Sequence, residues 1–135
     1  DTTRAVASLL FSGTFARCRN IRFIFSHAGG TVPFLAERMA RLEVRPDFRE
    51  AVPDGVLAEL KRLYFDTALS ANAFAFDALL RLVATEQVLF GSDYPFAPEA
   101  TMTATVKGLA GLGLDPAALA GIERGNALKL LPGLA

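Results

Sequence analysis

The chain has 135 residues, one His, one Cys and no Trp, and its 14 basic and 14 acidic side chains give a formal net charge of zero. One Cys excludes an internal disulfide, and one Cys with one His excludes a Cys/His zinc cluster. The zero net charge, without a basic block, argues against a nucleic-acid-binding protein that neutralises phosphates. No apolar run approaches the roughly 20 residues of a membrane span, and the first residues lack a signal-peptide pattern. These features predict a cytoplasmic protein that contacts neither nucleic acid nor membrane.

The hydrophobic content is high for a chain of this size. Hydrophobic residues make up 52% of the sequence before glycine is counted, and the mean hydropathy is +0.34. Average domains reach about 45–50% with glycine included, and a small domain leaves a large share of its surface in water. We therefore expect the chain to form homo-oligomers or to be part of a larger protein.

The first third of the chain predicts a helix, a strand and a second helix. Apolar residues at helical spacing predict a helix from residue 2 to about residue 16, with Asp1 as its N-cap. The run IRFIF at residues 21–25 predicts a buried strand. A second helix is predicted over residues 32–42, with Pro33 in its first turn, where proline is tolerated.

A loop, a helix and a second strand are predicted in the middle of the chain. Pro46 and Pro53 bracket a predicted loop, and Asp54 is a candidate cap for a helix over about residues 55–62. A second buried strand is predicted at residues 63–65.

A helix, a third strand and further helices are predicted for the rest of the chain. An amphipathic helix is predicted over residues 72–84, and a third buried strand over residues 87–90. Three more helices are expected, at about residues 99–112, 115–120 and 125–131. Asp115 and Asn126 are candidate caps for the last two.

The order of these elements predicts an α/β fold. Alternating helices and strands form a parallel sheet with right-handed crossovers. Strands that read as continuous apolar runs are expected to be buried on both faces. A doubly wound sheet and a (β/α)8 barrel both satisfy this pattern.

Polar side chains follow each predicted strand. His27 comes directly after the first, Asp66 after the second, and Asp93 after the third. Ligand and catalytic sites of α/β proteins form at the carboxyl ends of parallel strands. One imidazole and two carboxylates converging there are typical of a metal site or a proton-transfer site.

Each of these residues also has a structural interpretation. A lone His in a turn is often structural, but Gly29 and Gly30 follow His27 and allow a close backbone approach. Asp66 serves equally well as a turn cap, and an Asp such as Asp93 before a Tyr-Pro turn often makes only local hydrogen bonds. Arg38 would ordinarily be a solvated helix charge. Cys18 lies between two arginines that would lower its thiol pKa, but no second His or paired Asn supports a nucleophilic role.

Four motifs together resemble a known family. They are FSHAGGTVPF at residues 25–34 with Arg38 after it, LYFDTA at 63–68, VLFGSDYPF at 88–96, and Gly-Asn-Ala at 125–127. In this order and spacing they resemble the C-terminal half of the metal-dependent amidohydrolase superfamily. The branch they resemble most is the aminocarboxymuconate-semialdehyde decarboxylase type, which includes decarboxylases of salicylate-like and resorcylate-like acids.

The resemblance implies a fold and a set of roles. The fold would be the C-terminal half of a (β/α)8 TIM barrel, with the three strands as strands 6, 7 and 8. His27 would act as the catalytic acid or base, and Asp93 would bind a divalent metal, expected to be zinc, and help move a proton. Arg38 would lie near a subunit interface and bind a substrate carboxylate. The resemblance assigns no role to Asp66.

The family's metal ligands on strands 1 and 5 have no counterpart in this chain. They would precede Asp1, so we expect residues 1–135 to be one part of the barrel domain and inactive alone. The function implied for the complete protein is non-oxidative decarboxylation of an aromatic or unsaturated carboxylic acid. The alternatives are a metal-dependent hydrolase of a lactone, amide or ester, and a non-catalytic half-barrel that self-associates. A flavodoxin-like binding domain is disfavoured because residues 27–30 make a poor phosphate loop.

Overall fold

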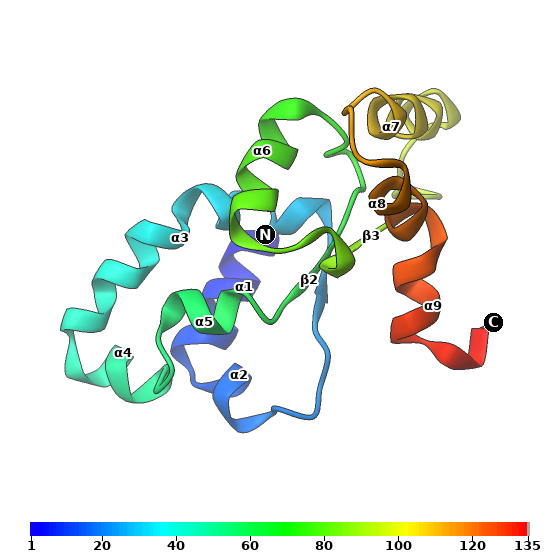
Figure 1. The fold of residues 1–135 in the computed structure, drawn as a ribbon. Coiled ribbons are helices and arrows are strands. Elements are labelled where there is room, and N and C mark those ends of the chain that lie inside the picture. The colour runs from blue at the N-terminus through cyan, green and yellow to red at the C-terminus, as the bar shows by residue number, and fades with distance from the viewer. Residues whose placement is uncertain (135) are drawn as a thin grey trace.

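A three-stranded parallel sheet forms the centre of the computed structural model, which describes residues 1–134 (Figure 1). The strands are β1 (Ile24–Phe25), β2 (Tyr64–Asp66) and β3 (Val88–Leu89), and they lie side by side in that order. Ile24 is opposite Tyr64, and Phe65 is opposite Val88. The three predicted strands, their parallel pairing and the α/β class are confirmed.

Helices connect each strand to the next and extend beyond the last. Figure 1 shows α7, α8 and α9 at one end of the molecule and α1 to α5 at the other, and residues of α6 and α7 line a common cavity. The helices are α1 (Thr2–Phe11), α2 (Thr14–Arg17), α3 (Val32–Ala40), α4 (Pro46–Ala51), α5 (Val56–Leu60), α6 (Ala73–Leu82), α7 (Glu99–Ala110), α8 (Pro116–Ala120) and α9 (Asn126–Leu130). None of the helices within residues 1–134 is both long enough and apolar enough to cross a bilayer.

The core packs against one face of the sheet. Phe65, in the central strand, is 0% exposed, whereas Ile24 on the neighbouring strand is 46% exposed. Phe25 points the other way from Ile24 along β1, and its ring lies 6.0 Å from that of Phe15 in α2. The prediction that β1 is buried on both faces is therefore wrong, because its second face remains exposed to solvent.

The helix predicted over residues 2–16 is two helices. Gly13 adopts φ +72°, and this left-handed residue separates α1 from α2. A side chain there would crowd the Arg17 guanidinium, because a Cβ would lie 2.9 Å from its Nη1. Asp1 occupies the N-cap position of α1 as predicted, but its side chain makes no capping hydrogen bond.

The segment predicted as a loop between the two prolines contains α4. Pro46 occupies the first turn of this helix, where its missing N–H costs nothing. Asp54 does not cap the next helix but accepts hydrogen bonds from Arg19 and Arg62. The first turn of α5 is instead satisfied by Glu43, whose Oε1 accepts the Val56 N–H at 2.7 Å.

One predicted cap, Asp115, is confirmed, and Asn72 forms a second cap that was not predicted. Asn72 Oδ1 accepts the Ala75 N–H at 3.1 Å at the start of α6. Asp115 Oδ2 accepts the Ala118 N–H at 3.2 Å at the start of α8. Both follow the local rule that a short polar side chain satisfies a free amide of the first turn.

Asn126 has a different role from the predicted cap. It is buried, and its Nδ2 donates to the carbonyl oxygens of Thr85 and Val88, each at 2.8 Å. The backbone of residues 121–125 continues from α8 into α9 as a π-turn, so no free helix start exists at this point. Asn126 therefore ties the last helix to β3.

Candidate active site

The turn after β1 presents His27 in a left-handed backbone conformation. His27 has φ +59°, Ala28 φ +52°, Gly29 φ +77° and Gly30 φ +64°. A residue with a Cβ at positive φ costs about 1–2 kcal/mol, so two such residues in succession need support from their surroundings. Strain of this kind clusters at functional sites.

Glycine at position 29 allows this turn to approach the central strand. A Cβ on Gly29 would lie 2.6 Å from Cε1 of Phe65. Gly29 therefore serves the contact between the His27 turn and β2 in addition to the positive φ, whereas Gly30 approaches α1, where a Cβ would lie 2.7 Å from Thr3 Oγ1.

Asp66, the last residue of β2, holds the same turn from the other side. Its Oδ1 accepts the His27 N–H at 2.7 Å and the Ala68 N–H at 3.0 Å. Burial raises the pKa of this carboxyl, while the two backbone hydrogen bonds and His27 oppose the rise. The carboxylate fits because residue 91 is glycine, where a Cβ would lie 2.8 Å from Asp66 Cγ.

Thr67 fixes the start of the segment that carries Asp93. Its side chain is fully buried, and its Oγ1 both donates to the Gly91 carbonyl and accepts the Gly91 N–H, each at 3.1 Å. Asp93 has φ +64°, and its carbonyl accepts the Ala97 N–H at 2.8 Å. Sequence reasoning missed Thr67 and Gly91, although both lie in motifs that it had found.

His27 and Asp93 converge at the carboxyl edge of the sheet. The His27 Nε2 lies 3.6 Å from Asp93 Oδ1, and the two side chains are 36% and 21% exposed. The charges of both also act on the carboxyl of Asp66, with Asp93 raising its pKa and His27 lowering it. The structure thus brings together the three strand-end residues as the sequence predicted, in a site that solvent still reaches.

The donors at this edge fall short of a complete metal site. Within residues 1–134, no group of three His, Cys, Asp or Glu side chains is arranged to hold a metal ion. Imidazole nitrogen and carboxylate oxygen are both suitable ligands for zinc. A catalytic zinc takes three protein ligands, so the two donors at this edge are too few to form such a site without further residues.

Arg38 lies apart from these residues. It is exposed in the last turn of α3, the helix that begins at Val32, close to the His27 turn. A helix rises about 1.5 Å per residue, so the six positions from Val32 to Arg38 carry the guanidinium away from the edge where this helix begins.

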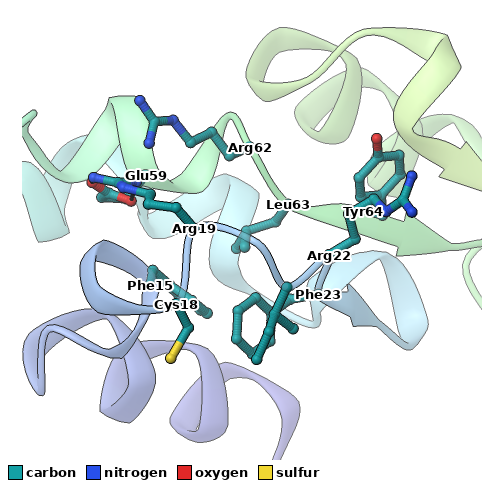
Figure 2. Close-up of a pocket in the computed structure, with 10 residues that line it drawn as sticks. Phe15, Cys18, Arg19, Arg22, Phe23, Glu59, Arg62, Leu63 and Tyr64 are labelled. Carbon is teal, nitrogen blue, oxygen red and sulfur yellow. Dashed lines mark hydrogen bonds and ion pairs between the residues drawn. The ribbon is translucent and has the colours of Figure 1, made fainter. Parts of the chain in front are cut away.

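A second group of charged residues occupies the opposite edge of the sheet. Cys18, the segment before β1 and the start of β2 line a cavity of about 350 Å³ there. Figure 2 shows Arg19 beside Glu59, and the Arg19 Nη2 donates to Glu59 Oε1 at 2.6 Å. Glu59 is only 1% exposed, and its hydrogen bond raises the pKa of Arg19. This paired network supports the fold, and it lies away from His27.

Comparison with known proteins gives a consistent family assignment. A sequence profile described as amidohydrolase matches residues 1–133. The 6-methylsalicylic acid decarboxylase of Penicillium expansum is 35% identical over 135 residues, which cover 99% of this chain and 42% of that protein. The 2-amino-3-carboxymuconate-6-semialdehyde decarboxylase of Dictyostelium discoideum is 31% identical over 97 residues, which cover 71% of this chain and 27% of that protein. The chain thus spans less than half of either relative.

Solved structures share the fold. The dihydroxybenzoic acid decarboxylase of Polaromonas sp., solved with bound manganese and the inhibitor 2-nitroresorcinol, superposes with a TM-score of 0.79. The likeness covers 98% of this chain and 40% of that one at 17% identity. It shows that the arrangement of helices and sheet described above recurs within a larger chain.

Proposed function

This chain belongs to the amidohydrolase family, and we propose that it forms strands 6 to 8 of a (β/α)8 barrel that acts as a metal-dependent, non-oxidative decarboxylase. The substrate class that its relatives support is an aromatic carboxylic acid, as in 6-methylsalicylic acid decarboxylase. The observation that carries the proposal is the convergence of His27 and Asp93, 3.6 Å apart, at the carboxyl ends of parallel strands. Active sites of barrel enzymes lie at that edge.

Asp93 is the proposed metal ligand of this segment. Its carboxylate stands at the open edge of the sheet, and Thr67 holds the backbone of Gly91, two residues before it. The donor types at this edge suit a divalent cation such as zinc or manganese, and the remaining ligands would come from the rest of the barrel. When bound, the metal supplies Lewis-acid polarisation of the substrate oxygens and activation of water.

His27 is the proposed proton donor. The ring carbon that bears the carboxylate takes a proton from the imidazolium. The bond to the carboxylate then breaks, CO2 leaves, and the bonding electron pair returns to the ring. The net change replaces one carboxylate by one hydrogen and needs no oxidant or reductant. The His27 Nε2 lies 3.6 Å from Asp93 Oδ1, so the proposed proton donor and the proposed metal ligand face the same space at the edge of the sheet.

Arg38 is the proposed substrate-binding residue. A guanidinium pairs with a carboxylate through two parallel hydrogen bonds. Because α3 carries Arg38 away from the His27 edge of its own chain, it would meet a substrate carboxylate in the site of a second copy. The proposal therefore includes a homo-oligomer.

Product analysis with the complete protein tests the proposed reaction. The protein loaded with zinc or manganese is incubated with 6-methylsalicylic acid and with related hydroxybenzoates, and the released CO2 and ring product are measured. The expected result is one CO2 per substrate consumed, with no net oxidation.

Two other outcomes would contradict the proposed reaction. Hydrolysis of lactones, amides or esters without CO2 release would assign the site to the hydrolases. A protein that self-associates but turns over neither substrate class would indicate a non-catalytic half-barrel.

A further inference from the structure

We propose that Asp66 is a positioning residue whose carboxylate fixes the left-handed turn that aims the His27 imidazole at Asp93. This inference rests on the proposed function of His27 and extends it to a residue for which the family resemblance gives no role. The carboxylate acts on the backbone of the turn, and it neither exchanges protons nor binds metal.

The hydrogen bonds of Asp66 identify what it holds. Its Oδ1 accepts the His27 N–H at 2.7 Å and the Ala68 N–H at 3.0 Å. Each carboxylate oxygen offers about two lone-pair sites, so these two amides fill the acceptor capacity of Oδ1. One oxygen thus joins the end of β2 to the turn after β1, across 39 residues of sequence.

The conformation of the turn explains why it needs this support. His27 and Ala28 both have positive φ, which residues with a Cβ adopt rarely. The hydrogen bond from Asp66 reaches the backbone amide of His27 itself, so it fixes the residue from which the imidazole projects. Without this acceptor, the amide would lose a charge-assisted hydrogen bond, and the turn could relax away from Asp93.

The third strand completes the support of the carboxylate. Gly91 lies directly against Asp66, and a Cβ there would come within 2.9 Å of Oδ2 and 2.8 Å of Cγ. Thr67 holds Gly91 through both of its backbone groups. Asp66 is therefore packed between the ends of β1 and β3, which restricts its carboxylate to the orientation that receives the two amides.

The experiment compares Asp66→Asn with Asp66→Ala in the complete, metal-loaded protein. Asparagine keeps an oxygen that accepts the two amides, whereas alanine removes it. We expect Asp66→Ala to lower kcat about 10- to 100-fold, the scale of a misplaced catalytic group, with KM and metal content little changed. Asp66→Asn should keep kcat within about threefold of the wild type, because the acceptor geometry survives.

Crystal structures of the two variants give a readout that does not depend on activity. The proposal predicts that Asp66→Asn keeps the His27 Nε2 within about 0.5 Å of its present distance from Asp93, a tolerance typical of working catalytic geometry. Asp66→Ala should show the turn displaced. If alanine prevents folding, Asp66→Asn alone decides the question through its kcat and its structure.

Two results would overturn the proposal. Equal loss of activity in both variants with an undisturbed turn would mean that the charge of Asp66 takes part in proton transfer or metal binding. An Asp66→Ala protein with wild-type kcat and an unmoved His27 would mean that the contact positions nothing. If instead the turn moves as predicted while the complete protein decarboxylates no substrate, the proposed function fails and the positioning role stands.

Discussion

Asn126 offers a sharp test of how the last helix is attached to the sheet. Its Nδ2 donates to the carbonyls of Thr85 and Val88, each at 2.8 Å, and the residue is buried. Asn126→Ala removes both donors. A net hydrogen bond contributes about 1 kcal/mol, and a buried carbonyl left without a donor costs about 1–3 kcal/mol. We expect the free energy of unfolding to fall by about 2–4 kcal/mol, since water reaches the Thr85 carbonyl more easily than the Val88 carbonyl.

A matched variant separates this role from helix capping. Asn126→Asp keeps the size of the side chain but points an oxygen at two carbonyl oxygens, so it should destabilise the protein more than alanine does. A helix cap predicts the reverse, because aspartate is among the best N-caps. Urea unfolding of both variants, followed by circular dichroism, decides between the two. An Asn126→Asp protein as stable as the wild type would refute the bridging role.

Three further predictions test the core, the buried ion pair and the metal. Gly29→Ala should lower the free energy of unfolding by about 2–4 kcal/mol, because alanine is strained at positive φ and would overpack against the central strand. Gly113 also has positive φ but has open space around it, so Gly113→Ala should lower the free energy of unfolding by only about 1–2 kcal/mol. Thermal unfolding of the two variants measures the difference. Arg19→Ala leaves the buried Glu59 unpaired and should lower the free energy of unfolding by about 3 kcal/mol. Arg62→Ala removes an ion pair at the surface and should lower it by at most about 1 kcal/mol. Equal losses in the two variants would contradict this assignment. Chelation should abolish decarboxylation by the complete protein, and added zinc or manganese should restore it; activity that survives chelation would exclude the metal role.

The sequence predicts the strands well because their signal is local. Each strand is a short apolar run, and each is followed at once by a polar residue, so His27, Asp66 and Asp93 could be placed at one edge once the sheet was known to be parallel. The cap at Asp115 was predicted for the same reason, since a cap and its amide lie within one helical turn. The cap at Asn72 is equally local, although it was not predicted.

The contacts that the sequence did not predict join residues far apart in the chain. Asp66 accepts the amide of His27, and Asn126 reaches Thr85 and Val88, over separations of 38 to 41 residues. Local patterns carry no information about such partners, so Asp66 could be interpreted only as a turn cap or a site residue. The same limit hid the break at Gly13, because a glycine inside an amphipathic pattern is compatible with a continuous helix.

The most direct test of the central claim measures both CO2 release and bound metal in two variants of the complete protein. His27→Ala should lower CO2 release by about 10²- to 10⁴-fold, the usual contribution of a general acid, while the bound metal per chain stays close to that of the wild type. Asp93→Ala should lose both turnover and metal, because its carboxylate is the proposed ligand of this segment. A His27→Ala protein that releases CO2 at the wild-type rate, or an Asp93→Ala protein that keeps its full metal content, would contradict the assignment of this site.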